Sequence, residues 1–381
     1  MNKTWIFAIM ALALGTSCSK EKGIDIDDSS RQEILLGTGS TVSVSRASRG
    51  YGAVGGADDA TNKWNGETVY VYGINNTATG DAKFAINAQE AKAPSGAVTG
   101  TLTWVGNNVH YYYNGNDLYD FYAVHVNDAV SDAANALKIA PETDLEETPL
   151  TVDLTLNGTQ DIMVAVPDKE KDIENNDKVT DTGKLYSAWS SRRDVKPNLV
   201  FTHLLTRLNF MAMCGNTALP EVGKEIKITK IEVLDVFNKA TLSIIPEQKL
   251  TTIAKDPEAP VNFELMKEGT GDLVAFDSHT VSSNTDFEQV GANMLVCPES
   301  AYKAKIYLEQ DSDGDGEIKD NEKTNKTYDI ALTEGKVFEA GYMYNIKLTV
   351  YSLERIDIEA TLKPWVQGDD VNIGQDEITI P

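Results

Sequence analysis

The run NLVFTHLLTRLNFMAM, residues 198–213, is rich in apolar, β-branched and aromatic side chains and predicts β structure. Similar short runs recur along the chain, and Gly, Asn, Asp and Pro fill the gaps between them. They lie at residues 68–73, 118–125, 161–166, 227–236, 293–297, 303–308, 326–332 and 344–351. Helical periodicity is scarce, since residues 129–139 and 168–176 predict at most short helices or loop insertions. The fold class is therefore predicted to be all-β.

Many short strands separated by turn residues favour β-sandwiches among the all-β architectures. The chain contains no repeat with a short fixed period, which argues against propellers and solenoids. It has 381 residues, a length that suits two such domains once a leader is removed. We predict an N-terminal sandwich at residues 47–216 and a C-terminal sandwich at residues 217–381.

The chain carries a formal net charge of -24, with 34 Lys and Arg against 58 Asp and Glu. Binding to nucleic acid requires clustered Lys and Arg that neutralise phosphates, so this charge argues against a nucleic-acid partner. The same charge disfavours flat contact with an anionic membrane surface. The acidic side chains instead predict a solvated exterior, on which surplus carboxylates are available to bind a divalent cation.

Residues 1–18 predict a lipoprotein signal peptide. Lys3 supplies positive charge, and residues 5–14 form an apolar stretch too short to span a bilayer. Small residues then precede Cys18, whose lipidated thiol would anchor the precursor. A plain secretory signal with an incidental cysteine is the alternative, and either leader takes the protein out of the cytoplasm. The polar residues 19–30 suit a flexible tether.

Residues 32–46 alternate between apolar and polar side chains and predict a strand, despite a Gly-Thr-Gly interruption. Its apolar face is formed by Ile34, Leu36, Val42 and Val44. The sequence RASRG at residues 46–50 follows directly and leads into a glycine-rich run that ends at Gly56. Such a junction is predicted to be exposed and open to a protease.

A twelve-residue acidic loop, DSDGDGEIKDNE at residues 311–322, matches the ligand pattern of a calcium-binding loop. Calcium needs several oxygen ligands around one point, and Gly316 permits the sharp turn between them. The predicted ligands are Asp311, Asp313, Asp315, Glu317 (through its backbone carbonyl) and Glu322. The flanking sequences predict hairpin strands rather than the helices of an EF-hand. The alternative is therefore an acidic, solvated hairpin turn without a metal.

Several of these segments, taken in order, resemble the fimbrillin family of the Bacteroidetes. In the first half they are VYVYG (69–73), TW (103–104), YYYNGNDLYDFYAV (111–124), DIMVA (161–165) and LVFTHLLTRLNF (199–210). In the second half they are MLVCPES (294–300), VFEAGYMYNIKLTV (337–350) and the late Trp365. No single segment is specific, but the order and spacing together with the leader support the resemblance.

The resemblance implies two transthyretin-like Greek-key β-sandwich domains and assembly into a type V pilus. It also implies export as an outer-membrane lipoprotein, followed by cleavage by an arginine-specific, trypsin-like protease. Cleavage would remove residues 19–46, the tether and first strand, and open a groove for a strand of another fimbrial subunit. The expected scissile bond is Arg46–Ala47, with Arg49–Gly50 as the alternative.

The donor of the added strand is expected to be the tail, residues 366–381, in which Val371 and Ile373 alternate with polar residues. Ile378 and Ile380 continue the alternation after Gly374. The alternative is that the tail completes a sheet of its own domain. A tip adhesin in this family would be expected to lack a free donor tail, so the tail favours a stalk or accessory subunit.

The sequence contains no recognisable catalytic motif. The four histidines, His110, His125, His203 and His279, lack metal-ligand spacing, and no nucleophile elbow or phosphate-binding loop occurs. His203 is predicted to be a hydrogen-bonded strand residue rather than a base. We therefore expect a protein that is not an enzyme.

The sequence also leaves open the function of the chain and the state of its two late cysteines. The chain could be a tip adhesin of the same fimbria, or a monomeric surface lipoprotein that binds glycans. Polymerisation needs the Arg46–Ala47 bond and the tail beyond Trp365, whereas a glycan receptor needs neither. Cys214 and Cys297 lie in apolar, strand-like runs, and they either form a disulfide or remain two separate buried thiols.

Overall fold

A computed structural model describes residues 32–38, 64–97, 99–113, 117–141, 143–176, 179–267, 274–332 and 336–363. The described residues belong to one compact unit that begins at Gln32. Most of their regular structure is strand, which confirms the predicted all-β fold. Cys18, the Arg46–Ala47 bond and the tail beyond Trp365 lie outside the described residues.

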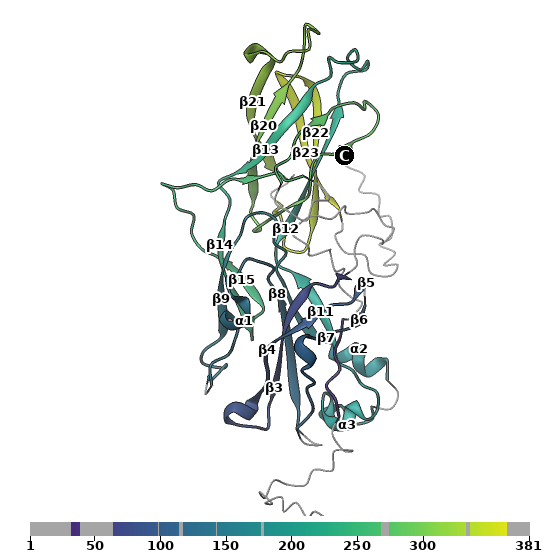
Figure 1. Cartoon of the computed structure of the whole chain (residues 1–381), viewed down its shortest axis with the longest axis vertical. Coiled ribbons are helices and arrows are strands. Elements are labelled where there is room, and N and C mark those ends of the chain that lie inside the picture. The colour runs from purple at the N-terminus through teal and green to yellow at the C-terminus, as the bar shows by residue number, and fades with distance from the viewer. Residues whose placement is uncertain are drawn as a thin grey trace, which may run out of the picture. The chain divides into compact units, whose positions relative to one another are not determined.

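The largest sheet has eight strands in the order β6-β1-β11-β10-β8-β3-β4-β7. Their bounds are β1 Gly37–Thr38, β3 Thr68–Asn75, β4 Phe84–Lys92, β6 Gly100–Thr101, β7 Thr103–Trp104, β8 Tyr119–His125, β10 Met163–Pro167 and β11 Asn198–His203. Neighbouring strands run antiparallel except β1 and β11, which run parallel. Figure 1 shows β3 side by side with β4 and β8, the strands with which it pairs.

Two further sheets consist mainly of strands from the C-terminal half. The first has the order β18-β12-β22-β23, with β19 also paired to β12, and the second has the order β16-β13-β20-β21, with β17 also paired to β13. The strands of the first are β12 Thr206–Cys214, β18 Glu288–Gln289, β19 Met294–Val296, β22 Met343–Ser352 and β23 Arg355–Lys363. Those of the second are β13 Lys227–Leu234, β16 Phe263–Glu264, β17 His279–Thr280, β20 Ala301–Glu309 and β21 Lys323–Ala331. Both sheets contribute to one buried apolar cluster, as the layers of a β-sandwich do.

The remaining elements are short. Three strands form one small sheet, β9 Leu150–Thr155, β14 Lys239–Ile245 and β15 Lys249–Thr252, and β2 Trp64–Asn65 pairs with β5 Ser95–Ala97. The α-helices are α1 Ala133–Ala136, α2 Lys169–Glu174 and α3 Ala188–Ser191, so the two predicted short helical segments are confirmed. The 3₁₀ turns are η2 Gly80–Lys83, η3 Val105–Asn107, η4 Thr182–Lys184 and η5 Asp320–Glu322. Among the described residues, no helix has both the length and the apolar character needed to cross a membrane.

Strand pairing crosses residues 216 and 217, where the domain boundary is predicted. Strand β12 precedes these residues but pairs in parallel with β22, with Arg207 opposite Met343. Strand β9 likewise pairs with β14 from the other side of the boundary. The division of the chain at residues 216 and 217 stays a prediction.

Alternating burial explains why these runs form strands. In β11 the side chains of Leu199, Phe201 and His203 are buried, while that of Thr202 between them is exposed. In β20 buried Ile306 and Leu308 alternate with half-buried neighbours. Because successive side chains of a strand point to opposite faces, this pattern places one face on the core and the other towards water.

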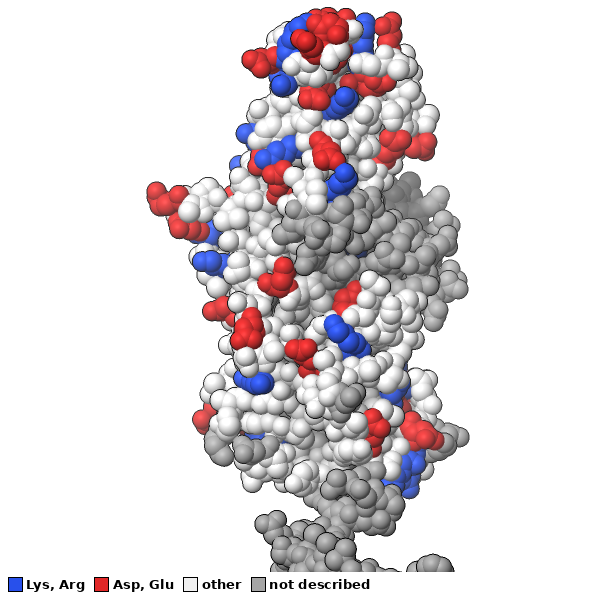
Figure 2. All heavy atoms as spheres, viewed as in Figure 1, with Lys and Arg blue, Asp and Glu red and all other residues white. Residues whose placement is uncertain are grey.

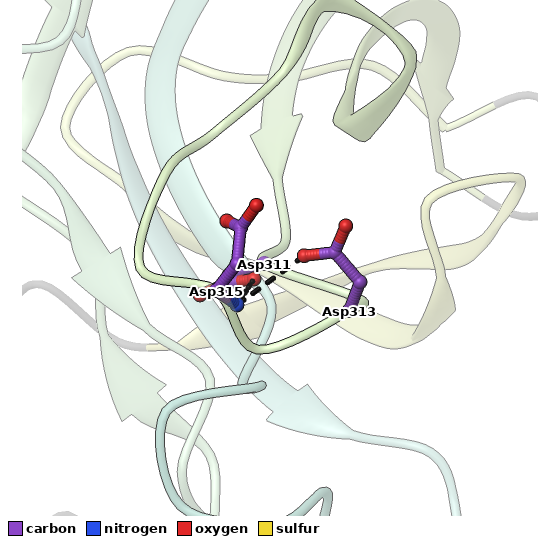
Figure 3. Close-up of side chains that lie close together, drawn as sticks. All are labelled: Asp311, Asp313 and Asp315. Carbon is purple, nitrogen blue, oxygen red and sulfur yellow. Dashed lines mark hydrogen bonds between the residues drawn. The ribbon is translucent and has the colours of Figure 1, made fainter.

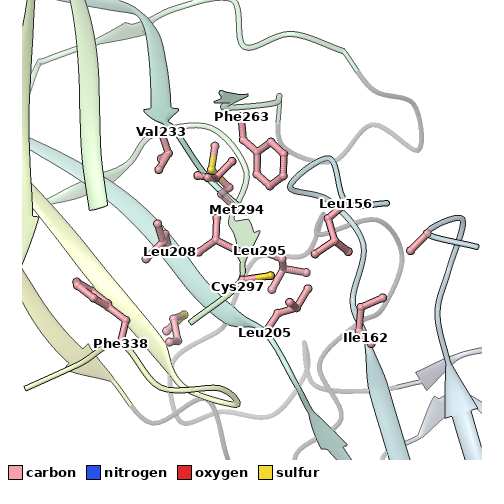
Figure 4. Close-up of a cluster of buried hydrophobic side chains, with 14 of the residues drawn as sticks. Leu156, Ile162, Leu205, Leu208, Val233, Phe263, Met294, Leu295, Cys297 and Phe338 are labelled. Atoms are coloured by element: carbon pink, nitrogen blue, oxygen red, sulfur yellow. The ribbon is translucent and has the colours of Figure 1, made fainter. Parts of the chain in front are cut away.

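The apolar core consists of two clusters. The larger cluster contains side chains from both sides of residue 216, including Leu156, Ile162, Leu208 and Phe263 (Figure 4). The smaller cluster lies against the eight-stranded sheet and includes Ile34 and Leu36, Trp64 and Phe201. The first described segment of the chain is therefore part of a core rather than an extended surface arm.

Cys214 and Cys297 are both free and buried. Val296 lies opposite Thr206 in the β12–β19 pair, so the neighbouring Cys297 is displaced from Cys214 by at least eight residues of β12. At about 3.4 Å per residue this is roughly 27 Å, whereas a disulfide needs Cα atoms within about 7 Å. The two thiols of one chain cannot pair. Burial raises the pKa of the Cys297 thiol to about 12, which makes it unreactive.

Candidate functional site

The segment Gln32–Thr38 fills a slot in the eight-stranded sheet, between β11 on one side and β6 with residues 110–112 on the other. We call this space the first-strand slot. Backbone hydrogen bonds join the segment to both sides of the slot. They run from Gly37 N to Pro197 O (2.9 Å), from Ile34 N to His110 O (2.8 Å), from Tyr112 N to Gln32 O (3.0 Å) and from Leu102 N to Leu36 O (2.9 Å).

Burial of the segment follows the alternation that its sequence predicts. Ile34 and Leu36 are 0% and 1% exposed, whereas Leu35 between them is 47% exposed. Thr38 is also buried, and its Oγ1 accepts a hydrogen bond from the Gly100 N–H at 2.9 Å. The segment therefore supplies two apolar side chains to the smaller core cluster and presents the alternate side chains to solvent.

Gly37 is the tightest position in the slot. A Cβ atom at residue 37 would lie 2.2 Å from the Oδ1 of Asn198 and 2.8 Å from the Cε of Lys196. The Lys196 ammonium donates to the Thr101 Oγ1 at 3.1 Å, across the segment from β11. A glycine is the residue that fits this position without displacing its neighbours.

A buried carboxylate holds Asn198 in place. The Oδ1 of Asp172, in α2, accepts from the Asn198 side-chain amide at 2.6 Å, and its Oδ2 accepts from the Asn198 backbone N–H at 3.0 Å. The Tyr186 hydroxyl donates to the same Oδ2 at 2.7 Å. Burial, followed by the hydrogen bond to Asp172, raises the pKa of Tyr186, so this donor keeps its proton. The side chain opposite Gly37 is thus fixed rather than free to move aside.

The second candidate site is the acidic loop, which connects β20 to β21. The two strands form a hairpin with Glu309 opposite Lys323, as the flanking sequences predict. One carboxylate oxygen from each of Asp311, Asp313 and Asp315 lies within 4.8 Å of the others (Figure 3). Asp311 also shapes the turn, because its Oδ1 accepts from Gly314 N at 2.7 Å and its Oδ2 accepts from Gly316 N at 2.8 Å.

A lysine of the loop contacts two of these carboxylates. The Lys319 ammonium donates to Asp313 and, at 2.6 Å, to the Oδ2 of Asp315. These contacts raise the pKa of Lys319 and lower the pKa of Asp315. Lys319 is position 9 of the twelve-residue pattern, where a calcium loop often binds through water. A bound cation would therefore have to compete with this ammonium group.

The carboxylates of Glu317 and Glu322 do not belong to the cluster of the three aspartates. Glu322 is 2% exposed, and its carboxylate accepts from the Ser312 Oγ (2.5 Å), the Ser312 N–H (2.7 Å) and the Lys319 N–H (3.1 Å). These hydrogen bonds, led by that from the Ser312 side chain, lower the pKa of Glu322 to about 2. Glu317 is exposed, and its backbone N–H donates to Asp315 at 2.9 Å. Glu322 clamps the ends of the loop together in this arrangement.

His203 is a hydrogen-bonded residue of a strand, as predicted. It is buried at the end of β11, and its Nδ1 lies 2.9 Å from the Oδ1 of the fully buried Asp161. Arg207 is buried near this pair: burial lowers its pKa to about 10, although the Asp161 charge opposes that shift. On the face shown in Figure 2, basic side chains stand between acidic ones and form no continuous basic area.

Sequence reasoning missed three residues of these sites. From sequence, Gly37 is part of a Gly-Thr-Gly interruption of a strand, whereas in the structure it is the position at which the strand passes Asn198. Asp172 lies in a charged stretch, and only its hydrogen bonds in the structure reveal that it holds Asn198. Lys319 could have been noticed as a cation at a ligand position of the loop.

Comparison with known proteins identifies the family to which this chain belongs. A model of fimbrillin-like proteins matches residues 57–365. A candidate cell adhesion protein from Bacteroides uniformis superposes with a TM-score of 0.52 at 14% identity, covering 89% of this chain and 99% of that chain. The fimbrillin FimA from Porphyromonas gingivalis has a TM-score of 0.44 at 14% identity, covering 90% and 100%. The tip fimbrial protein Mfa3 from the same organism has a TM-score of 0.39 at 11% identity, covering 88% and 100%. No curated protein sequence matches the chain.

The fold is that of the β-sandwich proteins of fimbriae and cell adhesion. The family match covers most of the chain, and the chain belongs to the fimbrillin-like family. That family consists of structural, non-enzymatic proteins, and membership implies a cell-surface location and assembly with other fimbrial subunits.

Proposed function

We propose that the chain is a structural subunit of a type V fimbria that polymerises by strand exchange after cleavage at Arg46–Ala47. The observation that carries the proposal is the first-strand slot. The segment before the cleavage site is hydrogen-bonded on both sides, and it places Ile34 and Leu36 in the core.

Loss of residues 32–46 would leave a defined gap. Backbone groups that the segment now satisfies, such as the Pro197 carbonyl and the Leu102 N–H, would lose their partners. The places of two buried apolar side chains would be vacant at the same time. Unpaired strand edges recruit external strands, and pockets for alternate side chains give such addition its specificity. The donor is the tail of another subunit, residues 366–381.

The signal peptide at residues 1–18 directs export of the precursor to the cell surface. Cys18 is lipidated in the precursor, which the lipid anchors in the outer membrane until an arginine-specific, trypsin-like protease cuts the chain. The role is structural rather than catalytic, in keeping with the family. No nucleic acid takes part, because the net charge of -24 opposes phosphate binding.

The acidic loop is proposed to bind Ca²⁺ weakly and to stiffen the β20–β21 hairpin. The convergence of Asp311, Asp313 and Asp315 supports this, since carboxylate oxygens are the ligands that Ca²⁺ prefers. Glu317 would add its backbone carbonyl, and Glu322 would have to turn away from Ser312 to join them. Calcium would also have to displace the Lys319 ammonium, and both requirements favour a low affinity.

Digestion of the purified precursor with an arginine-specific protease tests the proposed function. The products are analysed by gel electrophoresis without boiling and by electron microscopy, with Arg46→Ala and a truncation after Trp365 as controls. A ladder of stable multimers that requires both elements supports strand exchange. A clean cut that leaves only monomer contradicts it and points to a tip adhesin or a monomeric glycan-binding lipoprotein, which glycan and adhesion screens would separate.

A further inference from the structure

The segment that fills the first-strand slot shares a pattern with one part of the tail. Residues 32–38 read QEILLGT, and residues 369–375 read DDVNIGQ. In both segments two polar residues precede two apolar residues spaced two apart, and a glycine follows the second apolar residue. The tail lies outside the described residues, so the comparison uses its sequence against the geometry of the slot.

The slot sets distinct requirements at positions 33 to 37. The side chains at positions 34 and 36 are buried and must be apolar, whereas those at 33 and 35 face solvent. Position 37 must be glycine, because a Cβ there would meet the fixed side chain of Asn198 at 2.2 Å. Its backbone N–H is also required, since it donates to the Pro197 carbonyl.

Only one window of the tail meets all these requirements. With Gly374 at position 37, Val371 and Ile373 enter the two buried positions and Asn372 faces solvent. With Gly368 at position 37, the polar Gln367 would take the place of Leu36. With Ile378 and Ile380 in the buried positions, Pro381 would fall at position 37, where it has a Cβ and no N–H to donate.

We propose that residues 369–375 of a second copy of this chain occupy the first-strand slot in the direction and register of residues 32–38, with Gly374 in the place of Gly37. This rests on the proposed strand exchange and specifies its donor. Asp370 takes the exposed position of Glu33. Gln375 takes the buried position of Thr38, where its side-chain amide oxygen can accept the hydrogen bond from the Gly100 N–H. Residues 369–375 of the second copy then form hydrogen bonds with the same backbone groups as the segment that the protease removes.

Disulfide trapping tests directly the register of the tail in the slot. Glu33 and Tyr111 are opposite in an antiparallel bridge, flanked by the bonds from Ile34 N to His110 O and from Tyr112 N to Gln32 O. They form a non-hydrogen-bonded pair, in which side chains approach most closely. The full chain carrying Tyr111→Cys and Asp370→Cys is cleaved, assembled, oxidised and run on a denaturing gel. The register control is Tyr111→Cys with Asn372→Cys, which reports a strand shifted by two residues.

Covalent multimers from the Asp370→Cys pair alone support the proposed register. The proposed register is overturned if multimers are covalent only with Asn372→Cys, or if multimers form without any crosslink. In both cases strand exchange itself still stands. Absence of multimers in every variant overturns the proposed function and the register with it. A matched pair of glycine variants adds a second readout: Gly374→Val should abolish the ladder, and Gly368→Val should leave it intact. Equal assembly of the two variants would contradict the assignment of Gly374.

Discussion

Gly37 and Asn198 lie opposite each other in the parallel β1–β11 pair, and the Asn198 Oδ1 occupies the space that a Cβ at residue 37 would need. Because Asp172 fixes Asn198 from the other side, the contact is a steric limit on which strand can enter the slot. The same limit applies to the precursor's own segment and to any strand that replaces it.

The precursor should therefore lose stability when Gly37 acquires a side chain. Gly37→Ala is expected to lower the free energy of unfolding by about 1–3 kcal/mol, the usual effect of overpacking a filled site. Urea unfolding of the uncleaved chain measures the change. In the double variant with Asn198→Ala the obstruction is gone, so the two effects should not add. Strict additivity would show that Asn198 is not the obstruction.

Substitution of the two adjacent leucines of the segment should have very different effects on the free energy of unfolding. Leu36 is 1% exposed and Leu35 is 47% exposed, although the residues are chemically identical neighbours. Leu36→Ala is expected to lower the free energy of unfolding of the precursor by about 2–5 kcal/mol. Leu35→Ala should stay within about 0.5 kcal/mol. Equal losses of stability in the two variants would contradict the place of Leu36 in the slot.

Most of the strands were predictable because their signal is local. Alternating apolar side chains mark β11 and β20 without knowledge of the fold. The run at residues 198–213 illustrates the limit of such patterns. Its sequence predicts one stretch of β structure, but the run divides at residues 204 and 205 into β11 and β12, which belong to different sheets. Periodicity identifies a strand, whereas the choice of partner depends on contacts with distant residues.

The sites show the same division between local and distant information. The acidic loop is a local motif, and the sequence alone locates its three converging aspartates. The requirement for glycine at residue 37 arises from Asn198 and Lys196, more than 150 residues away in the chain, so no local pattern contains it. The internal counterion Lys319 was visible in the sequence, but its contact with Asp315 depends on how the loop closes.

Removal of the Lys319 charge should strengthen calcium binding. In Lys319→Gln the ammonium no longer competes for Asp313 and Asp315, and the net charge of the site becomes more favourable to a cation. We expect affinity to rise about tenfold, equivalent to ~1.4 kcal/mol, as measured by calorimetry with Ca²⁺. Lys323→Gln, an exposed lysine in β21 just beyond the loop, is the matched control and should leave the affinity unchanged. Failure of the wild type and both variants to take up Ca²⁺ at millimolar concentration would end the calcium proposal.

Acid should open the loop through Glu322. The hydrogen bonds from Ser312 and Lys319 lower its pKa from 4.5 to about 2, so the folded state binds this proton less readily than the unfolded state does. A depressed pKa stabilises the fold above about pH 4.5, and that contribution is lost as the pH falls towards about 2. Melting temperatures measured between pH 5 and pH 2 should therefore fall less steeply in Glu322→Gln than in the wild type, because glutamine does not titrate. The exposed Glu317→Gln should keep the wild-type slope, since its carboxylate lies outside the clamp. Parallel curves for the wild type and Glu322→Gln would show that the fold does not depend on the charge of this carboxylate.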